Sequence, residues 1–196
     1  MSISLQKGQK VSLTKDHAGL STVIVGLGWD EVKPKGLKRF TAKQEDFDCD
    51  ASAFLLKNGR LANKGDIVYF GNLRHSSDCV THMGDNLTGG GDGDDEQIII
   101  DLPYVPQEYD RIIVVANIFQ ARARNQHFGM IENAFIRLVD GKTNVEMCRY
   151  DLTEAYPGMT AMIFGEVYRN GNEWKFNAIG QGTTDNSVTE LASRFE

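Results

Sequence analysis

The side chains with the clearest chemical potential in this 196-residue sequence are carboxylates gathered in two short stretches. The first stretch reads Asp46-Phe47-Asp48-Cys49-Asp50. If it is extended, alternation places Asp46, Asp48 and Asp50 on one face, about 6.5–7 Å apart, and the other two residues on the opposite face. Aspartate is a poor strand former and like charges on one face repel each other, so the pattern predicts a compensating positive charge nearby.

The second stretch, Gly84 to Glu96, combines five carboxylates, an amide and a hydroxyl with five glycines in thirteen residues. Glycine lets a backbone turn sharply and bring carbonyl oxygens beside side-chain oxygens. Hard oxygen ligands in a loop without His or Cys favour Ca²⁺, which takes roughly six to eight of them. Zinc would require nitrogen or sulfur ligands, and the spacing does not match an EF-hand. The loop therefore predicts a calcium site.

A solvated acidic loop without a ligand is the alternative interpretation of the same residues. The acidic strand that precedes the loop weighs against it, because a cation between the two segments would explain both. Asp30, which follows Trp29, could face the acidic strand across a hairpin and act as an additional ligand.

The remaining candidate groups are weaker. A zinc or redox site is disfavoured at His75, Cys79 and His82, because they supply only three ligands at irregular spacing. A turn that contains an isolated cysteine is the favoured interpretation. Arg122, Arg124 and His127 are more typical of a solvated helix face than of a phosphate site. Four scattered histidines give no nucleophile–base arrangement, and the acids of a paired-carboxylate hydrolase are not expected in so flexible a loop.

The elements that must position these residues are mostly short strands rich in β-branched residues and bounded by turn residues. We expect strands at Ser21–Leu27, Ala51–Leu56, Ile67–Phe70, Gln97–Leu102, Arg111–Ile118, Ala134–Val139, Glu146–Asp151, Thr160–Arg169 and Glu173–Ile179. Gly26-Leu27-Gly28 is expected to end the first strand, and Asn170-Gly171-Asn172 predicts a hairpin turn.

Helix is scarce. Thr184–Phe195 is expected to form one, with Asp185 or Ser187 as N-cap, and Gln120–Gln126 a shorter one. The pattern predicts an all-β fold, a β-sandwich of two mainly antiparallel sheets, formed by a single domain over residues 1–196.

The net charge of −6 and the isoelectric point near 5.3 argue against nucleic acid as the main partner. We expect neither a signal peptide nor a transmembrane segment, since no run reaches roughly 18 apolar residues. Cys49, Cys79 and Cys148 have no repeated spacing and are interpreted as reduced thiols. The expected location is the cytoplasm, where partners could bring the protein to the inner membrane.

Several motifs resemble the TerD family of bacterial tellurium-resistance and stress proteins. The resemblance rests on Val25–Asp30, Asp46–Phe54, Gly84–Glu96, Ala134–Val139, Arg149–Leu152, Gly171–Phe176 and Gly180–Gly182, and it covers nearly the whole chain. It implies a β-sandwich, two bound Ca²⁺ ions and a role in resistance to tellurite and other stresses. Carried over to this sequence, the candidate ligands are Asp46, Asp48, Asp50, Asp85, Asn86, Asp92, Asp94, Asp95 and Glu96, with Asp30 added.

The sequence departs from the family pattern at three places. Gly90 stands where an acid is usual, Phe119-Gln120-Ala121 replaces a common His-Asp-Ala, and Val32–Glu45 is longer and more basic than usual. We expect these changes to affect one calcium site.

The preferred hypothesis is a calcium-dependent binding module, not an enzyme, that joins other proteins of a stress-response assembly. The alternatives are a metal-dependent hydrolase or phosphate-handling enzyme that uses the same acidic site, and cysteines that handle tellurium oxyanions directly.

Overall fold

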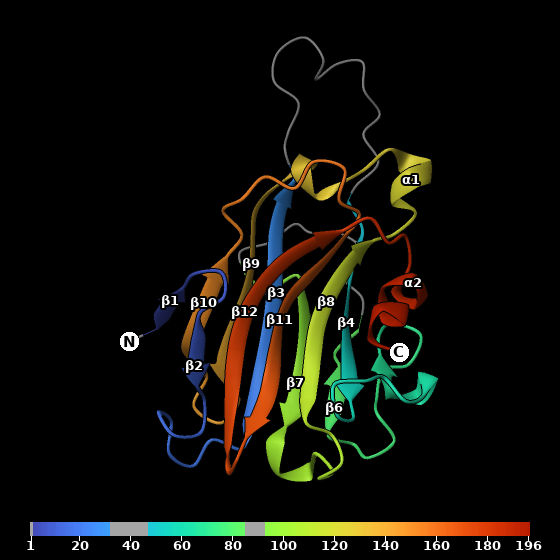
Figure 1. Ribbon diagram of the computed structural model, residues 1–196. Helices are drawn as coiled ribbons and strands as arrows, with labels where there is room; N and C mark the ends of the chain where they lie inside the picture. Colours follow the sequence, from blue (N-terminus) through green and yellow to red (C-terminus); the bar gives the residue numbers. More distant parts are fainter. Residues whose placement is uncertain (1, 32–46, 85–92) are drawn as a thin grey trace.

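The computed structural model describes residues 2–31, 47–84 and 93–196, which form two six-stranded sheets packed face to face (Figure 1). Sheet A has the order β1-β10-β9-β3-β7-β6 and sheet B the order β2-β12-β11-β8-β4-β5. The strands of sheet A are β1 (Ile3–Leu5), β3 (Thr22–Glu31), β6 (Val80–His82), β7 (Glu96–Asp101), β9 (Ile131–Asp140) and β10 (Val145–Asp151). Those of sheet B are β2 (Lys10–Ser12), β4 (Cys49–Leu56), β5 (Ile67–Val68), β8 (Arg111–Ile118), β11 (Ala161–Asn170) and β12 (Glu173–Thr183).

Within the described residues, β1 pairs with β10 in parallel and the other strand pairs are antiparallel. In the ranges that the structure describes, helix is confined to α1 (Ala121–Arg124), α2 (Val188–Ala192) and the 3₁₀ turns Lys64–Asp66, Leu102–Tyr104, Phe128–Met130 and Ser193–Phe195. The predicted all-β sandwich of two mainly antiparallel sheets is therefore confirmed. No helix among the described residues is long and apolar enough to cross a membrane.

The main core lies between the sheets and follows the alternation of each strand. Val23, Val25 and Leu27 of β3 point into it, as do Ala51 and Leu55 of β4. Strands β4 and β8 are buried on both faces, because α2 covers part of the outer face of sheet B (Figure 1). A strand that is covered on both faces is mostly apolar along its whole length, and this pattern allowed β4 and β8 to be predicted from the sequence.

The C-terminal helix is shorter than predicted. Ser187 is its N-cap and accepts a hydrogen bond from the Glu190 amide, so the helix starts four residues later than expected. Leu191 is fully buried against the outer face of sheet B, and the Phe195 ring meets Phe54 edge to face at 5.7 Å.

The nine predicted strands are all present; Arg111–Ile118 coincides with β8, and the other eight have shifted ends. Sequence patterns missed β1, β2 and β6, which have only three residues each. The hairpin at 170–172 is confirmed, with Gly171 at φ 64 between β11 and β12. The short helix expected at 120–126 is limited to α1.

The expected strand end at Gly26-Leu27-Gly28 is wrong, since β3 continues to Glu31. The two glycines do not form a turn. They leave space on the outer face of sheet A for the side chains of other strands. A Cβ on Gly26 would lie 2.2 Å from the Asp94 carboxylate, and one on Gly28 would lie 2.4 Å from the Phe135 ring.

Gly28→Ala should therefore destabilise the protein by about 1–3 kcal/mol, because the new methyl group overlaps both the Phe135 ring and the backbone oxygen of Gly93. Urea unfolding measures the change. Gly65→Ala is the matched control, since nothing lies within 4 Å of the position its Cβ would take. Equal stability of both variants would contradict the close packing on Gly28.

Candidate functional site

Six of the ten predicted ligands lie in the described part of the chain. They come from three places: Asp30 from β3, Asp48 and Asp50 from the start of β4, and Asp94, Asp95 and Glu96 from the start of β7. Asp46, Asp85, Asn86 and Asp92 lie outside the described residues, as do Gly90 and the segment 32–45.

The start of β4 confirms the predicted alternation. Phe47 and Cys49 are buried in the main core, while the even-numbered residues face the outer side of sheet B. Asp50 lies directly opposite Asn117 of β8 in the antiparallel register. Side chains in such pairs have Cβ atoms about 4.5–5.5 Å apart. The backbone carbonyl of Asp48 accepts a 2.7 Å hydrogen bond from the Phe119 amide, which extends the pairing beyond β4.

Four oxygen-bearing side chains share this outer face, and we call them the β4–β8 oxygen cluster: Asp48, Asp50, Ser52 and Asn117. Asp48 Oδ1, Ser52 Oγ and Asn117 Oδ1 are buried without a hydrogen-bond partner among the described residues. An unsatisfied buried polar atom costs about 1–3 kcal/mol. Asp48 and Ser52 are four residues apart on an extended strand, about 13 Å, so one cation cannot contact both. Carboxylate and amide oxygens are donors that Ca²⁺ prefers, and Asp48, Asp50 and Asn117 are the members of the cluster that fit such a cation.

The described residues compensate the charge of Asp48 only in part. Burial raises the pKa of its carboxyl above the ordinary value, the Arg124 guanidinium acts in the opposite direction, and the Glu96 carboxylate raises it further. Arg124 of α1 is thus the kind of positive charge that the acidic strand predicted. Its guanidinium lies 5.2 Å from the centre of the Phe119 ring, while Arg122 donates to the Thr184 carbonyl at 3.3 Å.

Glu96 joins the two sheets through buried hydrogen bonds. Its Oε2 accepts from the Ala51 amide at 2.9 Å and lies 3.0 Å from His82 Nε2. His82 Nδ1 accepts from the Gly84 amide at 3.1 Å, which leaves Nε2 as the donor toward Glu96 and toward the Ala51 carbonyl at 3.2 Å. Strand β5 pairs only with Ala53 and Phe54 of β4, so Glu96 and His82 provide hydrogen bonds to the backbone of Ala51 where β4 has no neighbouring strand among the described residues. Sequence reasoning missed this role of His82.

Asp94 and Asp95 have different environments. Asp94 lies on Gly26 and forms a bidentate ion pair with Arg137, at 2.6 and 3.1 Å. Asp95 accepts from the Trp29 amide at 2.8 Å, and burial raises the pKa of its carboxyl. The Trp29 amide opposes this pKa shift, whereas the neighbouring carboxylates of Asp30, Asp94 and Glu96 add to it.

The two acidic segments therefore approach each other around the first residue of β4. Burial raises the pKa of Cys49 well above its ordinary value, and the carboxylates of Asp50, Asp48, Glu96 and Asp95 raise it further. Within the described ranges, no three acidic, His or Cys side chains converge into a preformed metal centre. The structure brings the acids into one region, and the oxygen cluster holds the donors that fit a cation.

The other cysteine and histidine candidates separate in space. His75 Nδ1 lies 3.9 Å from the Cys79 sulfur and 2.7 Å from Ser77 Oγ, whereas His82 lies beside Glu96. The three do not form one site. All three cysteines of the chain are buried and free of disulfides.

Comparison with known proteins gives a consistent assignment. The sequence model of one family, described as the TerD domain, matches residues 1–195. A stress response protein of Bacillus subtilis is 49% identical over 198 residues, covering 100% of both chains. The tellurium resistance protein TerD of Serratia marcescens is 51% identical over 183 residues, covering 93% of this chain and 91% of its own.

Two solved structures have the same fold. A protein described as of unknown function superposes with a TM-score of 0.68 at 25% identity, covering 89% of this chain and 95% of its own. A homologue of telluride resistance protein (TerD) from Streptomyces coelicolor A3(2) gives a TM-score of 0.68 at 23% identity, over 91% of this chain and 99% of its own.

Asp48→Asn should stabilise the metal-free protein at pH 7 by up to about 1 kcal/mol, because a neutral amide avoids the cost of a buried charge. Because the pKa of Asp48 is raised in the folded state, the folded protein binds this proton more tightly than the unfolded chain does. The resulting stabilisation is complete below the unfolded pKa of about 3.9 and is lost as the pH rises through the folded pKa. The advantage of the variant should therefore shrink as the pH is lowered toward 4.

Urea unfolding in chelator between pH 4 and 7 measures this difference. Asp78→Asn is the control, at an exposed position with φ 59 that asparagine also tolerates. A stability difference for Asp48→Asn that is independent of pH would contradict the electrostatic account of this site.

Proposed function

The chain belongs to the TerD family, and from that premise we propose that it is a calcium-binding stress-response protein that acts as a calcium-dependent binding module. The relatives above carry the names of tellurium-resistance and stress-response proteins, which supports the proposed role in stress.

The β4–β8 oxygen cluster is the observation that carries the calcium proposal. Asp48 and Asn117 each bury an oxygen without a hydrogen-bond partner in the described part of the chain, and Asp50 lies directly opposite Asn117 in the strand pairing. The donors are fixed by two paired strands whose opposite faces are buried in the main core, so little conformational entropy is lost when they bind a cation. A bound Ca²⁺ would supply a partner for the Asp48 and Asn117 oxygens that have none among the described residues.

The neighbouring acids strengthen the case. Asp95 and Glu96 lie close enough to Cys49 for their charges to raise its pKa, along with those of Asp48 and Asp50. Arg137 already neutralises Asp94, and His82 contacts Glu96. We therefore assign the ligand role first to Asp48, Asp50 and Asn117, and assign Glu96 and Asp94 to holding β7 against β4 and β9. Asp46, Asp85, Asn86 and Asp92 remain candidate ligands from the sequence.

We propose binding rather than catalysis because Asp94 and Glu96, the acids nearest the cluster on β7, are engaged in structural contacts. The hydrolase alternative would need an anion-binding group at an open position of the same metal. Direct chemistry by the cysteines is disfavoured, since burial raises the pKa of Cys49, Cys79 and Cys148 and so suppresses their reactive thiolates. The proposed location is the cytoplasm, with other proteins of a stress-response assembly as partners.

Calcium should stabilise the folded protein by RT ln(1 + [Ca²⁺]/Kd), about 2.7 kcal/mol at a hundredfold excess over Kd. Asn117→Leu should remove most of that response, because it deletes a buried oxygen of the cluster. In chelator the same variant should be at least as stable as the wild type, since a buried amide becomes an apolar side chain of similar shape. Urea unfolding with and without Ca²⁺ measures both effects.

Loss of a ligand lowers the calcium response and leaves the stability in chelator unchanged or higher, whereas loss of the fold would lower both. Mg²⁺ at the same concentration is the ion control, and Asp78→Asn, far from the cluster in sequence and exposed, is the protein control. A full calcium response in Asn117→Leu would show that the cluster is not the site.

A further inference from the structure

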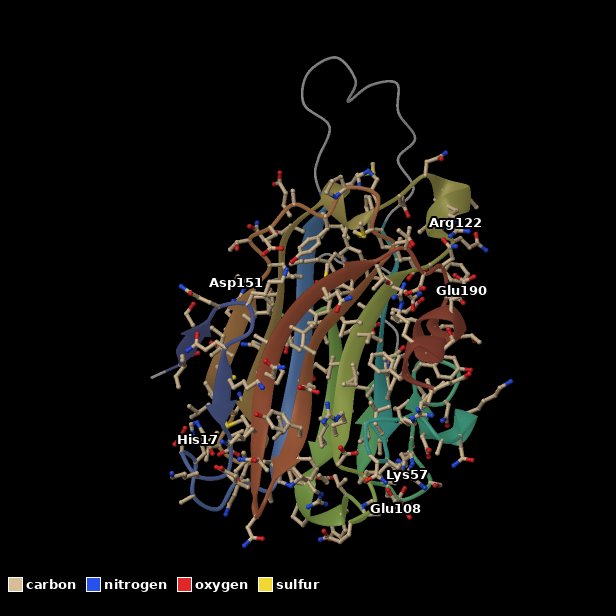
Figure 2. All side chains as sticks on the ribbon, viewed as in Figure 1. His17, Lys57, Glu108, Arg122, Asp151 and Glu190 are labelled. Carbon is tan, nitrogen blue, oxygen red and sulfur yellow. The ribbon has the colours of Figure 1, made fainter. Side chains whose placement is uncertain are left out.

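A second group of polar side chains lies at the opposite end of the sandwich from the β4–β8 oxygen cluster. Its members come from the 3₁₀ turn Lys64–Asp66, the hairpin before β6 and the approach to β8, and we call them the His75 group: Asp66, His75, Ser77, Cys79 and Tyr109. Lys57, at the lower end of the view in Figure 2, lies over the Tyr109 ring, 4.8 Å from its centre, whereas Arg122 of α1 lies at the upper end. Asp48 and Lys57 flank β4 at its two ends, about 30 Å apart. The group is therefore separate from the proposed calcium site.

His75 is a buried imidazole that is held from two sides. Its Nε2 lies 3.4 Å from Asp66 Oδ1, and its ring meets the Tyr109 ring edge to face at 5.3 Å. The Tyr109 hydroxyl donates to the same Asp66 oxygen at 2.7 Å. Burial alone would raise the pKa of Asp66, but hydrogen bonds from Tyr109, His75 and Asn63 lower it below its ordinary value. Asp66 is therefore a charged carboxylate at neutral pH.

The hydrogen bonds of the hairpin fix which nitrogen of His75 carries the proton. The Ser77 amide donates to His75 Nδ1 at 3.2 Å, so Nδ1 is the acceptor and the Nε2–H points to Asp66. The Ser77 hydroxyl oxygen lies 2.7 Å from the same Nδ1. A basic nitrogen thus faces a hydroxyl, and a carboxylate behind it would stabilise the imidazolium. This arrangement was not predicted from the sequence, because Asp66 approaches His75 only in the fold.

Cys79 completes the surroundings of the hydroxyl. Its sulfur lies 3.0 Å from Ser77 Oγ and is fully buried. Burial raises the pKa of this thiol, so the sulfur stays protonated at neutral pH. A neutral thiol is a weak acceptor, which leaves His75 Nδ1 as the better partner for the single hydroxyl proton of Ser77.

Ser77 is the accessible end of this chain of contacts. It is half-buried, whereas His75 and Asp66 are buried behind it. The Asp78 amide closes the turn by donating to the His75 carbonyl at 2.9 Å, and Asp78 has φ 59, which aspartate tolerates. The turn therefore brings the Ser77 hydroxyl to the surface and keeps its base inside.

We propose that Ser77 is an activated nucleophile that takes an acyl group from a small donor with a good leaving group, such as a thioester or an acyl phosphate. Ser77 Oγ forms the bond to the carbonyl carbon while His75 Nδ1 takes the hydroxyl proton. The bond to the leaving group then breaks, and His75 returns the proton to that group. Asp66 stabilises the imidazolium between the two steps.

The class of donor follows from what the His75 group supplies. It provides an oxygen nucleophile, a base and a carboxylate that orients the base, which together accelerate the attack. A donor with a good leaving group needs mainly this attack, because its second step is easy. The product is an acyl ester on a surface hairpin, and its formation requires no metal ion.

The test is incubation of the full-length protein, in chelator, with p-nitrophenyl acetate, followed by mass spectrometry of its fragmented peptides. Ser77 should gain an acetyl group about a hundredfold faster than the adjacent exposed Ser76, since general base catalysis contributes on this order. Ser77→Ala should abolish the ester on this peptide. Ser76→Ala is the matched control and should leave acetylation of Ser77 unchanged. Equal rates at the two serines of the wild type would overturn the proposal.

Two further measurements test the role of His75. His75→Gln should slow acetylation of Ser77 about a hundredfold, while acetylation of the exposed Lys64 in the same sample proceeds as in the wild type. In the wild type, which needs no substitution, the rate at Ser77 should rise with pH and level off once His75 is neutral. A rate at Ser77 that follows the rate at Lys64 across the pH range, or that is unchanged in His75→Gln, would contradict activation by the imidazole.

Discussion

Burial of carboxylates at one end of the sandwich is the constraint on which the surrounding structure depends. A buried charge is costly unless it is paired or accepts several hydrogen bonds. Three of the acids meet this requirement in different ways: Asp94 through Arg137, Glu96 through His82 and the Ala51 amide, and Asp95 through the Trp29 amide. Asp48 has the least compensation, since one of its oxygens is buried without a hydrogen bond from the described residues. This deficit is the physical basis of the calcium proposal.

The same acids organise the packing of the strands around them. Asp94 fits on the bare backbone of Gly26 and reaches Arg137 of β9, so its ion pair ties the start of β7 to the outer face of sheet A. Glu96 points the other way and reaches β4 in sheet B. Two residues apart in the sequence, they connect both layers of the sandwich. A cation bound by the oxygen cluster would therefore act on a region that is already coupled to both sheets.

Much of the fold was predictable, because strands such as β8 are long apolar runs that end at turn residues. Three-residue strands were not, since they contain too little pattern. The glycines of β3 were misread because their role, to accommodate Asp94 and Phe135, depends on contacts distant in sequence. For the site, alternation correctly placed Asp48 and Asp50 on one face and Cys49 on the other. Asn117 could not be found, because only the register between β4 and β8 places it opposite Asp50.

The central claim, that the buried oxygens at this end of the sandwich bind a cation, is tested most directly by calorimetric titration of chelator-treated wild-type protein with Ca²⁺ and with Mg²⁺. Repeating the titration near pH 5 in two buffers of different ionisation enthalpy counts the protons released. The account predicts Ca²⁺-selective binding with a whole-number stoichiometry, and proton release that increases as the pH is lowered, because burial raises the pKa of the Asp48 carboxyl and the ligand must lose its proton. Absence of binding, or equally weak binding of both ions without proton release, would contradict it.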